Sequence, residues 1–216
     1  MKKKLLSLLL VFALSITSLV GCSSTTDKKD DKDKSSTQSS EKIKFTDSLG
    51  REVEIPKSID KVAPSGGLAQ IVLFSIAPDK LVGLSSEWTK DAEGYIDSKY
   101  MNLPVFGQFY GQDNLNKEAL AAANPQVIID IGEVKKGAKE DLDSIQEQTG
   151  IPTIFIEATT EKMGDCYTTL GKLFDMEDEG KTLANYCDTT YQTTVDTMKK
   201  IGDNNKVKFT YCTGDT

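Results

Sequence analysis

The sequence predicts an α/β fold with a parallel, Rossmann-like sheet and flanking helices. Short apolar runs alternate with helix-length segments between residues 61 and 156, which is typical of βαβ units. The run at residues 127–131 is largely apolar, as in a strand that is buried on both faces. After residue 156 the alternation stops and helical periodicity follows.

The first half of this pattern opens with a β-hairpin over residues 45–56. Val53 and Ile55 alternate with glutamates, and Gly50 supplies the turn. A short strand, a helix that ends at a proline, a second strand, and a further strand with a loop after it are predicted next, at residues 61–63, 66–77, 80–84 and 103–107.

The second half begins with a helix over residues 117–123, which Asn116 caps and Pro125 stops. The central strand at residues 127–131 follows, and Gly150 suits the position after a helix C-terminus. The remaining elements of this half are a helix at residues 139–149, a strand at 153–156 and a helix at 161–174.

A long helix is predicted over residues 177–201, about 37 Å in length. Its apolar residues recur at steps of one, three and four: Leu183, Tyr186, Cys187, Tyr191, Val195 and Met198. Gly202 ends this helix, and residues 208–212 have the composition of a new strand.

The N-terminus has the pattern of a secretory signal. Three lysines at residues 2–4 precede a short apolar run, and Gly21 stands before Cys22. This arrangement resembles a bacterial lipobox, in which the cysteine takes a lipid and becomes the mature N-terminus. An uncleaved anchor helix is the alternative, although the run at residues 5–20 is short for a spanning helix. Both readings place the chain outside the cytoplasm at a membrane.

Composition excludes several classes of site. The sequence contains no histidine, so neither a Ser-His-Asp triad nor a His-based zinc or haem site can be built. The formal net charge of −7 and the single arginine, Arg51, argue against a nucleic-acid partner. Cys166, Cys187 and Cys212 fit no metal-binding spacing, and we expect buried thiols.

The order of these segments resembles the substrate-binding proteins of ABC importers for iron–siderophore, haem and cobalamin, whose two lobes are joined by one rigid helix. The resemblance rests on the hairpin at residues 47–56 and on the segments at 77–85, 116–129 and 142–155. It implies an N-terminal lobe, the long inter-lobe helix and one strand, with the second lobe largely absent.

The resemblance also implies a division of the chain. We expect a lipoprotein signal peptide, a disordered tether of small and charged residues, an N-terminal α/β lobe, helices including the inter-lobe helix, and the first strand of a truncated C-terminal lobe. The corresponding ranges are 1–21, 22–41, 42–160, 161–202 and 203–216.

Ligand-binding residues are expected in loops after the strands, at the carboxyl edge of the sheet. Ser65, Gly66 and Gly67 begin a helix whose backbone N–H groups suit an anion, although a plain glycine-rich helix start is the alternative. Trp88 and Tyr110 offer flat apolar surface for a macrocycle or a siderophore. Tyr95 and Phe109 are the other aromatic residues of these loops, and packing of some of the four rings under their own loops is the alternative.

Charged residues supply two further expectations. Glu133, Lys135 and Lys136 follow the central strand and are interpreted as a solvated loop rather than as ligand contacts. Glu118 falls where the resemblance implies a glutamate that pairs with arginines of the permease. The helix dipole offers another reason for a glutamate in a first helical turn.

The sequence therefore predicts a lipid-anchored, monomeric solute-binding protein, with no catalytic residues, no metal site of its own and no cofactor. Its expected ligand is an iron complex or a related metal chelate, with siderophore, haem, cobalamin and a small oxoanion left open. Its other expected partners are an ABC permease and the membrane. A surface lipoprotein that binds another protein and an exported hydrolase that uses two carboxylates are the alternatives.

Overall fold

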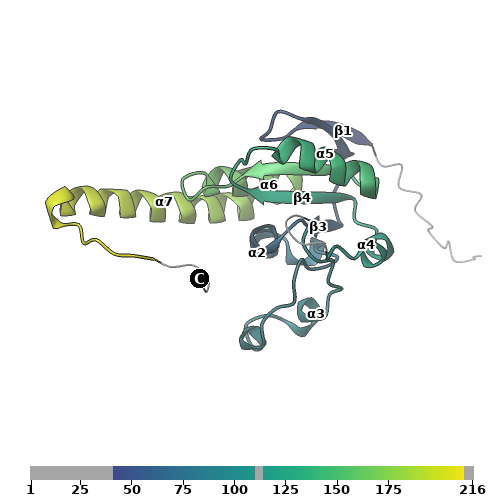
Figure 1. Ribbon diagram of the computed structural model, residues 1–216, viewed down its shortest axis with the longest axis horizontal. Helices are drawn as coiled ribbons and strands as arrows, with labels where there is room; N and C mark the ends of the chain where they lie inside the picture. Colours follow the sequence, from purple (N-terminus) through teal and green to yellow (C-terminus); the bar gives the residue numbers. More distant parts are fainter. Residues whose placement is uncertain (1–40, 110–113, 212–216) are drawn as a thin grey trace, which may run out of the picture. The chain divides into compact units, whose positions relative to one another are not determined.

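A three-stranded parallel sheet lies at the centre of this computed structural model, which describes residues 41–109 and 114–211 (Figure 1). The sheet order is β3 (Val62–Pro64), β4 (Val127–Gly132) and β5 (Thr153–Glu157). Ile129 pairs with Pro64 on one side and with Ile154 on the other, so β4 is the central strand. The predicted α/β class and the parallel sheet are confirmed.

Helices cover both faces of the sheet. Ile129 and Ile154 pack with apolar residues of α2 (Gly67–Ile76) and α6 (Met163–Leu173). Ile128 faces the other way and packs in a second cluster with residues of α4 (Lys117–Ala123) and α5 (Ala138–Thr149). Because the side chains of a strand alternate between faces, one apolar strand serves both clusters.

The hairpin of β1 (Lys42–Thr46) and β2 (Glu52–Pro56) packs against the edge of this sheet. Ser48 N donates to Phe155 O at 3.0 Å, and Glu157 N donates to Ser48 Oγ at 2.9 Å. The turn of the predicted hairpin therefore covers backbone groups of β5 that no strand pairs among the described residues, and this protects an edge strand.

The long helix α7 (Glu177–Ile201) has the predicted bounds and extends well beyond the sheet (Figure 1). Gly180 and Ala184 are its buried residues, so its first turns pack and most of its length is exposed. Among residues 41–109 and 114–211, no helix is both long and apolar enough to cross a membrane.

Two predicted strands form only single bridges. Leu81 pairs with Val62, whereas Leu84 pairs with Val105, so the segments at 80–84 and 103–107 form no ladder. A 3-10 turn, η1 (Pro78–Lys80), occupies the start of the first segment. The strand assignment at these two places was wrong because the two apolar residues of one segment pair with different neighbours.

The predicted strand at residues 208–212 was also wrong over its described part. Residues 206–211 follow a short 3-10 helix, η3 (Asp203–Asn205), and adopt no regular structure. Val207, Phe209 and Tyr211 are each at least 80% exposed. An alternating apolar pattern forms a strand only when another strand pairs with it. Among the described residues, no strand pairs with residues 206–211.

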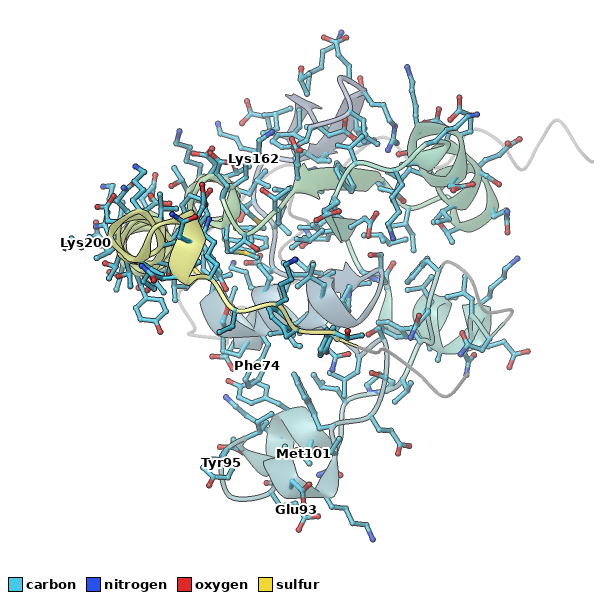
Figure 2. All side chains as sticks on the ribbon, turned by 60° about the vertical axis from the view of Figure 1, so that its left-hand side comes forward. Phe74, Glu93, Tyr95, Met101, Lys162 and Lys200 are labelled. Atoms are coloured by element: carbon cyan, nitrogen blue, oxygen red, sulfur yellow. The ribbon has the colours of Figure 1, made fainter. Side chains whose placement is uncertain are left out.

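Two smaller helical segments complete the described structure. They are η2 (Lys90–Ala92) and α3 (Ser98–Met101), and they lie in the connection between Leu84 and Val105. This connection contains the labelled side chains of Glu93, Tyr95 and Met101, which lie on the far side of α2 from the hairpin (Figure 2).

Candidate functional site

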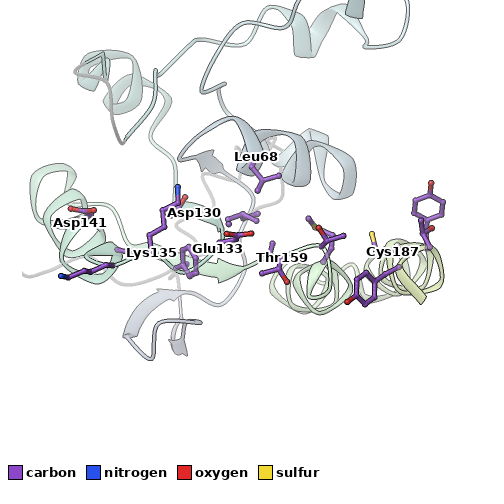
Figure 3. A pocket seen from close by; sticks show the side chains of 18 of the residues that line it. Leu68, Asp130, Glu133, Lys135, Asp141, Thr159 and Cys187 are labelled. Carbon is purple, nitrogen blue, oxygen red and sulfur yellow. The ribbon is translucent and has the colours of Figure 1, made fainter. Parts of the chain in front are cut away.

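A hollow of about 960 Å³ crosses the carboxyl ends of β4 and β5 (Figure 3). It extends from Lys135, before α5, and Asp141, in the first turn of α5, to Cys187 on α7. Leu68 of α2 borders it from another side. Ligands of open α/β sheets bind at this edge, so the hollow is the candidate site.

Asp130 is the carboxylate that the sheet itself brings to the hollow. It lies on β4 opposite Phe155 of β5, and both residues line the hollow. Ser65, which is 2% exposed, donates a hydrogen bond from its hydroxyl to Asp130 Oδ1. The end of β3 and the central strand are therefore joined through these two side chains.

The loops around α2 are held by a second polar group, Gln70. It is 3% exposed, and its Oε1 accepts from Ser85 N at 2.7 Å and from Ser86 N at 3.2 Å. Its Nε2 donates to Ser86 O at 3.2 Å. A buried amide with several partners fixes the path of the loop that begins at Ser85.

The structure places the predicted glycine-rich segment beside the hollow. Ser65 is buried with its hydroxyl directed to Asp130, while Gly66 is the N-cap of α2 and Gly67 is exposed at its first turn. The residue of this segment that borders the hollow is the next one, Leu68, which is 46% exposed.

Trp88 packs on α2 and does not line the hollow. Its ring meets Phe74 edge to face at 5.0 Å between centroids, and Phe74 meets Tyr100 at 5.3 Å. Its Nε1 is buried and finds no hydrogen-bond partner among the described residues. Figure 2 labels Phe74, which anchors this aromatic group.

The other predicted aromatic residues lie apart from one another. Tyr95 is 91% exposed (Figure 2), and Phe109 is half-buried against the cluster that contains Phe106. Phe109 N donates to Ser65 O at 3.0 Å, which brings this loop to the end of β3. Tyr110 lies outside the described residues, as do the lipobox residue Cys22 and Cys212.

The charged segment after β4 does border the hollow. Glu133, Lys135 and Lys136 are exposed, as expected of a solvated loop, and all three are among its lining residues. Glu118 is exposed in the first turn of α4, whose N-cap Asn116 accepts from Ala119 N at 2.9 Å. The placement of Glu118 suits both a docking role and the helix dipole.

One wall of the hollow comes from α7, which sequence reasoning did not assign to the site. Its lining residues are uncharged: Tyr186, Cys187, Thr190, Tyr191 and Thr194. Burial raises the pKa of Cys187 above its usual value and raises the pKa of the adjacent core thiol, Cys166, to about 12. These thiols are therefore protonated at neutral pH and act as apolar groups.

The sequence contains a signal for Asp130, which is easily overlooked when residues 127–131 are treated as a wholly apolar strand. It interrupts the apolar run of β4, and a lone carboxylate in a buried strand is unusual unless it is paired or functional. For a resident metal, residues 41–109 and 114–211 provide no group of three or more acidic or cysteine ligands.

Comparisons with known proteins rest on structure. Neither protein-family models nor curated proteins match the sequence. An ABC transporter solute-binding protein from Sulfurospirillum deleyianum matches with a TM-score of 0.66 and 22% identity, over 75% of this chain and 51% of that one. The molybdate-binding protein MolA of Haemophilus influenzae, bound to molybdate, matches with a TM-score of 0.62 and 17% identity, over 76% and 56%.

This is the fold of ABC transporter solute-binding proteins. A haem-binding protein, HmuT, matches with a TM-score of 0.50 and 17% identity, over 74% of this chain and 49% of that one. The chain thus spans about half the length of the solute-binding proteins that it matches. The fold and the partial coverage agree with the resemblance seen in the sequence.

Proposed function

We propose that this chain is the extracytoplasmic solute-binding component of an ABC importer. In this proposal it captures an iron complex or a related metal chelate and delivers it to a permease, without making or breaking a bond. The observation that carries the proposal is the hollow at the carboxyl ends of β4 and β5, in a fold shared with solute-binding proteins.

The lining of the hollow suits a chelate that offers both apolar and polar surface. Tyr186 and Tyr191 supply aromatic area, and the threonines of α7 supply hydroxyl groups.

The location and the partners in this proposal come from the sequence. Cys22 would carry the lipid that holds the chain at the outer face of the membrane, with residues 23–41 as the tether. Glu118 would contact basic residues of the permease, because complementary charges set docking register and encounter rate. We propose that the chain acts as a monomer.

Calorimetric titration of the 216-residue chain tests the proposed function. The probes are ferrioxamine B, ferrichrome, haem, cobalamin and molybdate. We expect saturable binding of at least one metal chelate. Absence of heat with all five probes would overturn the proposal and favour a lipoprotein that binds another protein.

A pair of neighbouring threonines on α7 provides the matched control. Thr190 lines the hollow, whereas Thr189 is exposed and does not. Thr190→Phe would fill part of the hollow and weaken chelate binding at least tenfold. Thr189→Phe adds the same ring elsewhere and should bind as the native chain does. Equal affinities of the two variants would show that the ligand occupies another place.

A further inference from the structure

The charged side chains that are described in the lining of the hollow include more carboxylates than ammonium groups. Among residues 41–109 and 114–211, three carboxylates line it, from Asp130, Glu133 and Asp141, against the two ammonium groups of Lys135 and Lys136. The described lining residues from β5, α6 and α7 carry no charge. An anionic ligand would therefore meet a net negative lining.

Asp130 is the most fixed of these charges. Glu133 and Asp141 are exposed, on a loop and on the first turn of α5, where side chains reorient freely. Asp130 is half-buried within β4 and is held by the hydroxyl of Ser65, which is itself 2% exposed. A carboxylate that is oriented before a ligand arrives loses little side-chain entropy on binding.

Two positive groups near this part of the fold, Arg51 and the start of α2, already have anionic neighbours. Arg51 is buried, and its Nε lies 2.9 Å from Asp143 Oδ1 and its Nη1 3.3 Å from Asp47 Oδ2. The start of α2 carries a partial positive charge, but the Ser65–Asp130 pair places a carboxylate beside it. The chain thus supplies its own anion at this helix terminus.

We propose that Asp130 determines ligand specificity, selecting a metal chelate that carries an ammonium or another cationic donor over neutral chelates and oxoanions. This proposal rests on the proposed function. Ser65 acts as a positioning residue, because its buried hydroxyl donates to the carboxylate. A charged acceptor in a partly desolvated site discriminates strongly against a ligand that lacks the donor.

Two ferric chelates that differ in one charge test this specificity. Ferrioxamine B is a trihydroxamate chelate with a free ammonium group, and its N-acetylated form lacks that charge. We expect the native chain to bind the first at least tenfold more tightly than the second, and we expect no binding of molybdate. The preference should diminish as salt concentration rises.

Variants locate the preference at one carboxylate. Asp130→Asn keeps the shape and an oxygen acceptor for Ser65 but removes the charge, so both chelates should bind with the affinity of the acetylated one. Asp91→Asn makes the same change at an exposed residue outside the hollow and should keep the full preference. Ser65→Ala should reduce the preference while leaving binding of the acetylated chelate intact.

The outcomes separate the two proposals. Equal affinity of the native chain for both chelates, or a preference that survives Asp130→Asn, overturns the role of Asp130 and leaves chelate capture standing. Binding of molybdate, haem or cobalamin with no binding of either hydroxamate also overturns the role of Asp130. Failure of the native chain to bind any of these probes overturns the proposed function itself.

Discussion

Arg51 shows how a single residue joins three parts of this lobe. Its Nη1 lies 3.3 Å from Asp47 Oδ2 in the hairpin turn, and its Nε lies 2.9 Å from Asp143 Oδ1 on α5. Its Nη2 donates to Thr153 O of β5 at 3.0 Å. Since the side chain is 4% exposed, its charge is stabilised by these partners rather than by water.

Replacing Arg51 should therefore be costly. We expect Arg51→Ala to lower the free energy of unfolding by about 3–5 kcal/mol, because it leaves the buried carboxylate of Asp47 without its counter-charge. Arg51→Lys should recover part of this loss, since one ammonium cannot reach all three partners. Urea unfolding followed by circular dichroism measures both.

Lys57→Ala is the control for this prediction. Lys57 pairs with Glu41 at 2.9 Å on the surface, where both side chains are more than 60% exposed. Exposed pairs contribute little, so this variant should unfold close to the native midpoint. An Arg51→Ala variant as stable as Lys57→Ala would show that the buried network does not hold the hairpin.

Two contacts of single residues show which features of the structure can be predicted from the sequence and which cannot. Asn116 caps α4 at the predicted position, because a side-chain oxygen that satisfies a helix N-terminus is a local interaction. Ser65, which donates a hydrogen bond to Asp130, lies far from it along the chain. Such a contact exists only after β3 and β4 have paired, so no local pattern predicts it.

At the scale of elements, α6 and α7 approach closely through two glycines. A Cβ added at Gly180 would lie 2.8 Å from the carbonyl oxygen of Tyr167 and 2.9 Å from Gly171 Cα. These positions let the two backbones come together at the base of α7. This contact fixes the position of α7 relative to α6, and with it the position of the α7 residues that line the hollow.

We expect Gly180→Ala to lower the free energy of unfolding by about 1–3 kcal/mol, because the added methyl group forces the helices apart. The loss should exceed the gain in helix propensity, which is up to about 1 kcal/mol. Thermal unfolding gives the comparison. Gly67→Ala, where a Cβ meets nothing within 4 Å, is the control and should not destabilise.

Most elements formed close to their predicted bounds, whereas the segments at 80–84, 103–107 and 208–211 formed no strand. The bounds of α7 follow from its periodicity and from Gly202. The segment at 80–84 failed as a strand because Gly83 packs against the ring of Phe106, and Leu81 and Leu84 bridge to separate partners. Whether an apolar run forms a ladder depends on its neighbours in space, which one sequence does not give.

For the whole molecule, the proposed membrane location rests on Cys22. We expect Cys22→Ser to move the protein from the membrane fraction to the medium, or to the soluble extracytoplasmic fraction, because the lipid acceptor is lost. Fractionation followed by immunoblotting measures this. A Cys22→Ala variant should behave in the same way, and continued membrane association of both would contradict lipid anchoring.

The proposed permease contact is tested separately from ligand binding. We expect Glu118→Ala to reduce chelate uptake several-fold in cells and to leave calorimetric affinity unchanged, because Glu118 is exposed and does not line the hollow. Glu147→Ala removes an exposed glutamate from α5 and serves as the control. Normal uptake by the Glu118 variant would argue for the helix dipole alone.

The Gly171–Gly180 contact gives α7 the mechanics of a lever. A helix of 25 residues is about 37 Å long, so a tilt of about 10° at its base would carry its far end through about 6 Å. Because the backbones already touch at the pivot, there is little room for such a tilt toward α6. A displacement of the residues beyond Gly202 would therefore require bending of the exposed turns of α7 or rotation at Gly202.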